Sequence, residues 1–511
     1  MEKSIDSTDT FLEKAKNQVK LWGKGLRQDK GMTLSLLYLF LPVFLFFFGW
    51  LRLFFAVLLF LLFLWLFCRI SQNLCVKGGG VNVKARPEYW ITLCVVVFIW
   101  VLFSGIGGFS FQNTDFYVRN PIYRDLVNQP WPVFFDFSTQ KESVQAVLGS
   151  DTVAFVYYFC FWLPPALLSK LFAGKELFAN IFLLAWAYLG VMLVLYQIHR
   201  YLKRCSWIIP GIFIFFSGFD VIGYRITKGD FELGTHLEWW GTYFQYSSNT
   251  TVLYWVFNQA IPVWLIVTLL LNLRGNGSGA GLSALAFAYS PFATFGMIPL
   301  AVYSIFKEKQ DWKKAVTWEN VLIPLSMMLV FGSFYLSNPG SLSVNGWIFE
   351  YYEAGDLLPA YVLFLVLEIG IYVLILGKCL KKYSYLWLAL IELALIPMYK
   401  MTVANDFAMR ASMPALLILS ICLTRYLLEQ RGIWKRWVIG MLLLLAAVTP
   451  LSELYRSVSK TAMHQAEPVE WVYSFQDFAT DSENVLEICR QQFFAYHPEE
   501  SFFFHYLGKR K

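Results

Sequence analysis

A polar and aromatic segment at residues 108–151 interrupts long apolar runs and carries the side chains best suited to chemistry. Its charged and amide candidates are Asp115, Arg119, Asn120, Arg124 and Asp125. A carboxylate such as Asp115 can take a proton from an acceptor hydroxyl, or it can orient a metal ion or a sugar. Guanidinium groups bind phosphate through paired hydrogen bonds, so Arg119 and Arg124 are candidates for holding a substrate phosphate. Asn120 and Asp125 are further candidates for substrate binding. In the alternative interpretation, these residues pair with one another and only fold the loop.

A second polar segment, residues 219–251, places a histidine and carboxylates beside aromatic rings. The candidates for substrate contacts here are His236, Glu238 and Trp239. Aromatic faces next to carboxylates and amides are typical of sugar-binding surfaces. An aromatic belt at a membrane surface would also explain the tryptophans, but it does not explain the neighbouring histidine and glutamate. His236 and Glu238 are two positions apart, so they do not form a two-ligand metal site on one helical face.

Ionisable residues also occur within or beside the later apolar stretches. Asp406 and Arg410 are four positions apart, which predicts an ion pair on one helical face. Arg410 could instead reach a phosphate or pyrophosphate, because charged residues in apolar helices usually have a function. Glu368 and Glu392 fall near the middle of two consecutive apolar stretches. They indicate a proton path, as in a transporter, unless they are neutral or paired with polar groups of neighbouring helices.

The composition indicates that membrane helices must position these residues. Of the 511 residues, 57% are hydrophobic and only 15% are charged. Runs of about 20 apolar residues recur along the chain, which excludes a globular domain with a single anchor. The net charge of +7 comes from basic clusters in short loops, typical of cytoplasmic loops rather than of nucleic-acid binding. The eight cysteines show no zinc or disulfide spacing, and no nucleotide-binding loop or hydrolase motif occurs.

The apolar runs predict an all-α polytopic membrane protein with about 13 transmembrane helices and an outer-face juxtamembrane helix. The expected spans are residues 33–49, 52–70, 89–107, 177–197, 206–219, 252–272, 280–291, 293–306, 319–337, 359–376, 384–400, 405–426 and 433–450. The pair at residues 280–306 is short and is expected to break at Ser290-Pro291. The basic clusters place the N-terminus in the cytoplasm and the C-terminus outside, provided that residues 151–173 do not cross the membrane. The Pro164-Pro165 break in that segment favours a juxtamembrane or half-inserted helix.

Three regions follow from this topology. They are a cytoplasmic amphipathic N-terminal segment, a transmembrane domain and an extracytoplasmic C-terminal tail, at residues 1–32, 33–450 and 451–511. The outer loops of the transmembrane domain are residues 108–176, 219–251 and 338–358. Chemistry on the outer side of the membrane is expected in these loops.

The order of a span, a long outer loop with acidic residues, a juxtamembrane helix and many further spans resembles the GT-C superfamily of integral membrane glycosyltransferases. The resemblance covers roughly residues 89–450, and Asp115 in Asn-Thr-Asp-Phe matches the position of the family's acidic motif. The Pro-Pro-Ala-Leu-Leu-Ser-Lys-Leu stretch looks like the family's Pro-rich juxtamembrane segment. Many members carry two adjacent acidic residues there, whereas Asp115 stands alone. One carboxylate is a poor divalent-cation site, so the participation of Mg²⁺ or Mn²⁺ stays open.

The resemblance implies transfer of a sugar from a polyprenyl-phosphate donor to a glycan, lipid or protein acceptor on the extracytoplasmic side. Asp115 would be the base, and Arg119, Arg124 or Arg410 would hold the donor phosphate. Few outer cysteines and short cytoplasmic loops favour a bacterial plasma membrane, where membrane lipids surround the protein and the product would belong to the cell envelope. The alternative functions are a transporter or flippase for a lipid-linked saccharide and a non-catalytic scaffold for an envelope-polymer complex.

Overall fold

The structure is a computed structural model. It describes residues 29–75, 86–273, 278–306, 316–338, 340, 345–353, 355–402, 405–463 and 474–510. Of the amphipathic segment expected at residues 1–32, only residues 29–32 fall within these ranges.

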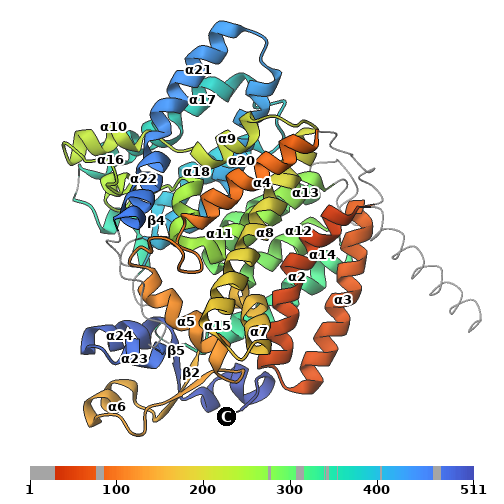
Figure 1. Cartoon of the computed structure of the whole chain (residues 1–511), viewed down its shortest axis with the longest axis vertical. Helices are drawn as coiled ribbons and strands as arrows, with labels where there is room; N and C mark the ends of the chain where they lie inside the picture. The colour runs from red at the N-terminus through yellow and green to blue at the C-terminus, as the bar shows by residue number, and fades with distance from the viewer. Residues whose placement is uncertain are drawn as a thin grey trace, which may run out of the picture.

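The long apolar runs form helices that pack side by side into one bundle (Figure 1). Its first helices are α2 (Lys30–Trp50), α3 (Leu53–Cys75), α4 (Pro87–Leu102), α8 (Glu176–Leu202), α9 (Ile208–Phe215), α10 (Asp220–Thr227), α11 (Asn249–Asn272), α12 (Gly279–Ala284) and α13 (Pro291–Phe306). The later ones are α14 (Trp318–Met327), α15 (Ser333–Tyr335), α16 (Leu357–Leu365), α17 (Ile371–Leu376), α18 (Leu386–Leu395), α19 (Asp406–Ala411), α20 (Met413–Glu429), α21 (Ile433–Ala446) and α22 (Val448–Ala462). Helix α11 is the central one, since its most apolar window is 94% buried.

Six of the described helices are long and apolar enough to cross a membrane, or seven if the bent pair α21 and α22 is one span. Four further apolar helices are shorter, including the pair on either side of Ser290-Pro291, where the sequence predicted a break. A helical membrane protein is therefore confirmed. The expected number of about 13 spans is not reached by helices of spanning length, which need about 20 residues each.

Several helices are interrupted or capped by short helical turns. The 3₁₀ turns are η1 (Cys160–Trp162), η2 (Leu237–Gly241), η3 (Leu285–Ala288), η6 (Ile348–Glu350), η8 (Gly377–Cys379), η9 (Ile396–Met398) and η10 (Pro498–Glu500). The π turns are η5 (Met328–Gly332), η7 (Val366–Gly370) and η11 (Phe503–Leu507). Two of these π turns lie inside expected spans, where a π turn leaves local backbone groups irregularly paired.

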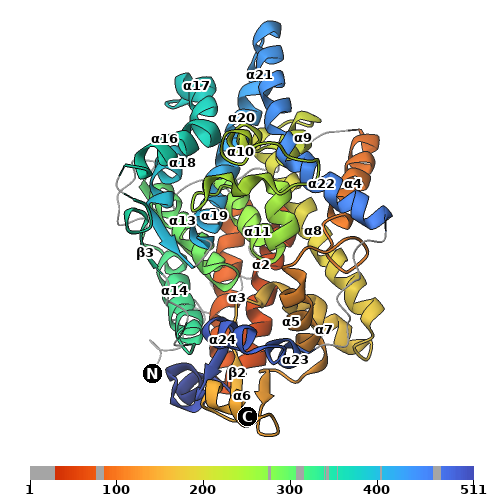
Figure 2. The same ribbon diagram turned by 90° about the vertical axis from the view of Figure 1, so that its left-hand side faces the viewer.

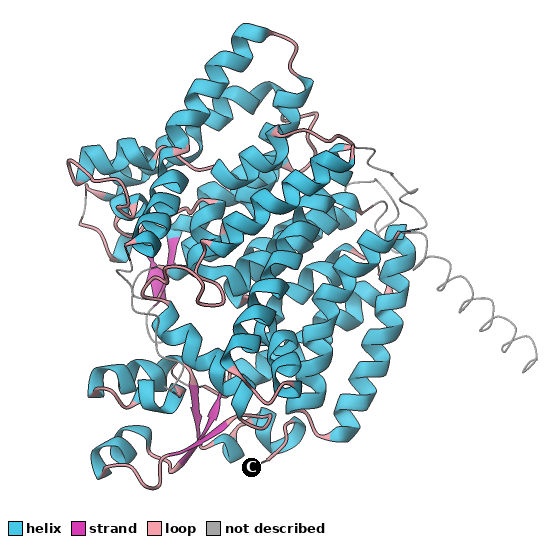
Figure 3. Ribbon diagram, in the orientation of Figure 1, coloured by secondary structure: helices cyan, strands magenta, loops and turns pink. Residues whose placement is uncertain are grey.

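A small antiparallel sheet at one end of the bundle departs from an all-α fold (Figure 3). Its order is β1 (Phe134–Asp136), β2 (Thr152–Phe155) and β5 (Phe494–Tyr496). The helices at this end are α5 (Phe116–Asn128), α6 (Glu142–Leu148), α7 (Leu163–Leu171), α23 (Phe475–Ala479) and α24 (Glu483–Gln492). Residues 474–510 of the expected C-terminal tail are thus joined to the first polar loop. A second pair, β3 (Asn345–Trp347) with β4 (Tyr399–Met401), lies on the flank of the bundle (Figure 2).

Residues 151–173, expected to stay outside the membrane, form β2, η1 and α7 rather than a span. Pro164 and Pro165 stand in the first turn of α7, where a proline ring costs no hydrogen bond. Helix α7 has only nine residues, too few to cross a bilayer. The short helix packs against α5 and α8, and it therefore supports the loop that carries Asp115.

Helix α22 has the reverse of the amphipathic pattern of a soluble surface helix. Its polar residues Ser452, Glu453 and Ser457 are buried, whereas Leu451 and Tyr455 are exposed. Intramembrane polar groups face the interior of a helix bundle and apolar groups face lipid, so this pattern fits a helix against lipid. The sequence placed residues 451–462 in a tail, but the structure packs them on the bundle at a bend of 44° from α21.

Candidate functional site

Helix α5 and the loop before it are fixed to the bundle by hydrogen bonds on both sides of Asp115. The Asn113 amide donates to the backbone oxygen of Tyr254 on α11, at 2.9 Å. The Tyr123 hydroxyl donates to the backbone oxygen of Ala179 on α8, at 2.8 Å. Phe116 and Ile122 are fully or almost fully buried on the same helix. Asp115, the residue before the first turn of α5, is therefore held in a defined place.

Asp115 forms an ion pair with Arg119, one turn further along α5. The Arg119 side chain is only 7% exposed and packs against the rings of Phe116 and Phe257, whereas Asp115 is 39% exposed. Its carboxylate is thus the open member of the pair. A buried guanidinium beside a half-exposed carboxylate can hold an anion and a proton acceptor next to each other.

The predicted ion pair between Asp406 and Arg410 on α19 is confirmed, with Nη2 of Arg410 at 3.1 Å from Oδ1 of Asp406. Asp406 also accepts the Thr402 hydroxyl at 2.9 Å. The helix begins at Asn405, whose side-chain oxygen accepts the backbone N–H of Ala408. This cap and the ion pair fix the direction in which Arg410 leaves its helix.

The structure brings Arg410 to the Asp115–Arg119 pair, although almost 300 residues separate them in the sequence. Arg410 donates from Nη1 to the Tyr158 hydroxyl at 3.3 Å, and Asp115 lies within electrostatic reach of Arg410. Tyr157, whose ring lies 3.8 Å from that of Tyr158, is in reach of both arginines. Burial raises the pKa of Tyr157, so this phenol stays neutral. We call Asp115, Arg119, Tyr157, Tyr158, Asp406 and Arg410 the arginine cluster.

Two nitrogens of the arginine cluster stay available for hydrogen bonding. Nη1 of Arg119 and Nε of Arg410 are buried and have no hydrogen-bond partner among the described residues. An unsatisfied buried donor costs about 1–3 kcal/mol, more when it is charged. Two cationic donors of this kind have the chemistry that binds an anionic group such as a phosphate.

The other candidates in the first polar loop lie outside the arginine cluster. Arg124 pairs with Asp125 at 3.1 Å, and Oδ2 of Asp125 accepts the backbone N–H of Phe475 on α23 at 2.8 Å. Burial raises the pKa of Asp125 to about 6, although the Phe475 N–H and Arg124 oppose this shift. Asn120 exchanges a hydrogen bond with Gln112 at 2.8 Å. These three residues join parts of the protein to one another.

The second polar segment forms a separate cluster around Glu453. His236 lies with Nδ1 at 2.7 Å from Glu453 on α22, and the Trp239 ring is 4.6 Å from its imidazole. Glu238 is buried and accepts the backbone N–H of Ser248 at 2.9 Å. Burial raises the pKa of Glu238 to about 7, with the His236 charge acting against the shift. Glu238 therefore holds Ser248, the N-cap residue of α11, and does not join Asp115.

Tyr157, Tyr158 and Glu453 were not among the residues predicted from the sequence. The adjacent tyrosines follow the Thr-Val-Ala-Phe stretch of β2 after one further valine, a signal for a strand that ends in polar rings. Glu453 lies in a segment that was assigned to the tail. The polar residues at positions 449, 452, 453 and 457 recur at helical spacing and were the available signal for a buried face.

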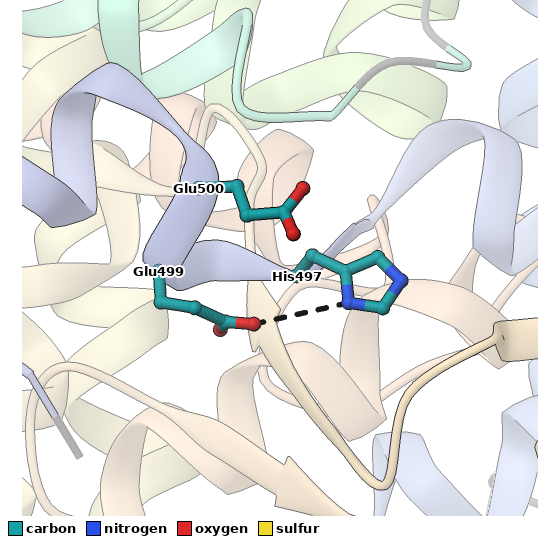
Figure 4. Close-up of side chains that lie close together, drawn as sticks. All are labelled: His497, Glu499 and Glu500. Atoms are coloured by element: carbon teal, nitrogen blue, oxygen red, sulfur yellow. Dashed lines mark ion pairs between the residues drawn. The ribbon is translucent and has the colours of Figure 1, made fainter.

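The described residues offer one group of three potential metal ligands, and Asp115 is not part of it. His497, Glu499 and Glu500 have ligand atoms within 4.8 Å of one another, at the end of β5 (Figure 4). Both glutamates are exposed, and exposed carboxylates gather on protein surfaces without a metal. Asp115 instead has a guanidinium as its close partner, which does not fit a divalent-cation site.

The bundle and the two polar clusters define a helical membrane protein with charged side chains buried among its elements. Comparisons with protein-family models, with curated proteins and with solved structures find no match to this chain. The chemistry of the arginine cluster therefore carries the functional argument.

Proposed function

We propose that the protein is a GT-C-type glycosyltransferase that moves a sugar from a polyprenyl-phosphate donor to an acceptor on the extracytoplasmic side of a membrane. The observation that carries this proposal is that Arg410 lies near the Asp115–Arg119 pair, because this arrangement combines phosphate donors with a proton acceptor. The buried donors Nη1 of Arg119 and Nε of Arg410 suit a phosphate, and apolar helices surround them. A lipid phosphate carries its charge at a membrane surface, where such a cluster can reach it.

In the proposed reaction, the donor phosphate competes with Asp115 for Arg119. The two arginines and two aspartates of the cluster balance in charge, so a phosphate that approaches the unpartnered nitrogens binds best when it also replaces a carboxylate at a guanidinium. Asp115 is the more exposed carboxylate and is the one released. It then takes the proton of the acceptor hydroxyl as that oxygen bonds to the anomeric carbon. The bond from this carbon to the phosphate oxygen breaks, and polyprenyl phosphate leaves with the electron pair and is stabilised by the arginines.

The proposal also includes the topology, the membrane and the acceptor expected from the sequence. They are about 13 spans in a GT-C-like arrangement, a bacterial plasma membrane, a cytoplasmic N-terminus, an extracytoplasmic C-terminus, and a glycan, lipid or protein acceptor in the cell envelope. No step requires a divalent cation, because the arginines supply the positive charge at the leaving phosphate.

Steady-state kinetics with purified protein and synthetic polyprenyl-phosphate sugars test the proposal. Arg119→Ala should raise KM for the donor about tenfold or more, the effect of losing a charge-assisted hydrogen bond. Asp115→Asn should lower turnover by about 10²–10⁴-fold yet leave donor binding at least as tight as in the wild type, because the competing negative charge is gone. Arg124→Ala, on the same helix but outside the cluster, is the matched control. Equal losses in Arg124→Ala and Arg119→Ala would overturn the assignment of the phosphate site.

A transporter or flippase for a lipid-linked saccharide is the second candidate, and one observation favours it. Glu368 and Glu392 are buried in successive apolar helices, and one oxygen of Glu368 and both oxygens of Glu392 have no hydrogen-bond partner among the described residues. Such carboxyl groups suit proton binding during transport. Translocation of a fluorescent lipid-linked saccharide in proteoliposomes, lost in Glu368→Gln and retained in Asp115→Asn, would favour the transporter over the transferase.

A further inference from the structure

The imidazole of His236 is held in one orientation by a carboxylate that is itself held on several sides. Nδ1 of His236 donates to Oε1 of Glu453, which is only 1% exposed. Oε2 of the same carboxylate accepts the indole N–H of Trp255 at 3.1 Å and pairs with Arg456. Ser452 further ties the His236 loop to α22, because its hydroxyl donates to the backbone oxygen of Thr235 at 2.8 Å. The tautomer and ring plane of His236 are therefore set by its surroundings.

The other ring nitrogen of His236 stays open. None of the described residues forms a hydrogen bond with Nε2, although the imidazole is packed between Trp239 and Trp255. Trp239 is 58% exposed and its ring centre lies 4.6 Å from that of the imidazole, so an accessible apolar surface adjoins His236. With the proton fixed on Nδ1, a neutral imidazole offers Nε2 as a hydrogen-bond acceptor.

We infer that His236 and Trp239 form a saccharide-binding subsite, in which Nε2 accepts a hydrogen bond from a sugar hydroxyl while the indole packs on the ring. A sugar presents C–H groups on its face and hydroxyls at its edge, which matches an indole next to a fixed acceptor. Two tryptophans could instead enclose an organic cation. The Arg456 guanidinium already lies over the Trp255 ring, 5.4 Å from its centre, and disfavours a second positive charge there.

In the proposed reaction this subsite binds the saccharide acceptor, and that role rests on the proposed function. Helix α11 connects it to the arginine cluster, because Trp255 contacts His236 and Phe257 lies against Arg119. The helix is kinked between them at Val256, where φ is −138° and ψ is 37°. The two sites are thus built on opposite sides of one kink.

Saturation-transfer NMR with the protein in lipid nanodiscs tests the subsite directly. The probes are free glucose, galactose and N-acetylglucosamine, with choline as the cation probe, and no glycoside detergent is present because it would compete. Saturation of the wild-type protein should be transferred to at least one of the sugars. Trp239→Ala and His236→Ala should weaken that binding about fivefold or more, the effect of one lost hydrogen bond or packing contact.

Trp434→Ala is the matched control, because Trp434 is also an exposed tryptophan and lies on α21, away from His236. It should bind the sugar like the wild type. The inference is overturned if wild-type protein saturates no sugar, if Trp239→Ala and the wild type bind equally, or if choline binds in place of the sugars. Trp239 is exposed, so its replacement leaves the fold intact and keeps the test decisive.

The pH dependence of sugar binding tests Glu453 as a positioning residue. Burial alone would lower the pKa of His236, but the hydrogen bond to Glu453 and the charges of Glu453 and Glu238 raise it above its ordinary value, against Arg456. An acceptor Nε2 requires neutral imidazole, so binding should appear as pH rises through this pKa. Glu453→Gln removes a negative charge, and the midpoint should move to lower pH. An unchanged midpoint would contradict the role of Glu453.

The two proposals fail in distinguishable ways. If Asp115→Asn retains turnover while Trp239→Ala loses sugar binding, the base assignment fails and the subsite stands. If sugar binding is insensitive to Trp239 and His236 while Arg119→Ala raises KM for the donor, the subsite fails and the phosphate site stands.

Discussion

Two arginine–aspartate pairs on α5 have opposite exposures. In the Asp115–Arg119 pair the aspartate is 39% exposed and the arginine 7%, whereas in the Arg124–Asp125 pair the aspartate is 3% exposed and the arginine 24%. The first pair presents its carboxylate to the surroundings and buries its guanidinium, whereas in both pairs one buried arginine nitrogen has no hydrogen-bond partner among the described residues. The second buries its carboxylate on a backbone N–H of α23. Similar residues in one helix thus separate into a chemical pair and a joining pair, according to which partner is buried.

The largest expected effect is the loss of catalysis when the aspartate of the first pair is replaced. Asp115→Asn should lower kcat by about 10²–10⁴-fold, the usual contribution of a general base. Asp125→Asn should leave kcat near the wild-type value, because Asp125 contacts α23 and not the arginine cluster. Single-turnover assays of both variants with saturating donor measure the difference. A similar loss of kcat in both would show that the two pairs act as one unit.

The next effect is on stability, when the aspartate of the second pair is replaced. Asp125→Ala leaves the Phe475 N–H without its acceptor and should lower the free energy of unfolding by about 1–3 kcal/mol. Asp115→Asn should cost about 0–1 kcal/mol, as is usual for a partly exposed pair. Thermal unfolding in nanodiscs gives the ranking, and amide hydrogen exchange should rise in residues 475–479 only for Asp125→Ala. Faster exchange of that segment in Asp115→Asn would reverse the assignment.

The smallest effect is a pH dependence. The pKa of Asp125 is raised to about 6 in the folded protein, above its value of about 3.9 in an unfolded chain. A raised pKa means that the folded state binds the proton more tightly. The stabilising contribution is therefore fully present below about pH 4 and is lost as pH rises through about 6. The Tm of the wild type, relative to that of Asp125→Asn, should fall over this range. Parallel curves would show that Asp125 does not titrate there.

The sequence predicted the helical membrane class and several individual residues of the site, because these depend on local patterns. Long apolar runs predicted the helices, and the spacing of Asp406 and Arg410 predicted their ion pair. The residues Asp115, Arg119 and Arg410 were selected by chemical type and by position at the ends of apolar runs. The break at Ser290-Pro291 was visible because proline cannot continue a hydrogen-bonded helix.

Contacts between residues far apart in the sequence could not be predicted in the same way. Nothing local to Arg410 indicates that it contacts Tyr158 and lies near Asp115, because this arrangement depends on how α5, α19 and β2 pack. The role of Asp125 was equally hidden, since its partner Phe475 lies 350 positions away. Glu453 was missed because the helical pattern of α22 is inverted, with polar residues inward and apolar residues outward.

The position of β5 in the small sheet determines when the arginine cluster can be finished during synthesis. β2 leads directly to Tyr157 and Tyr158, and it is paired on one side with β1 and on the other with β5. The backbone N–H of Val156 donates to Phe493, and Lys509 reaches back to the end of α2. All the membrane helices leave the ribosome before residues 493–509 do. The nascent chain can therefore be inserted in the bilayer and still lack a completed sheet, so the cluster matures only after the last strand arrives.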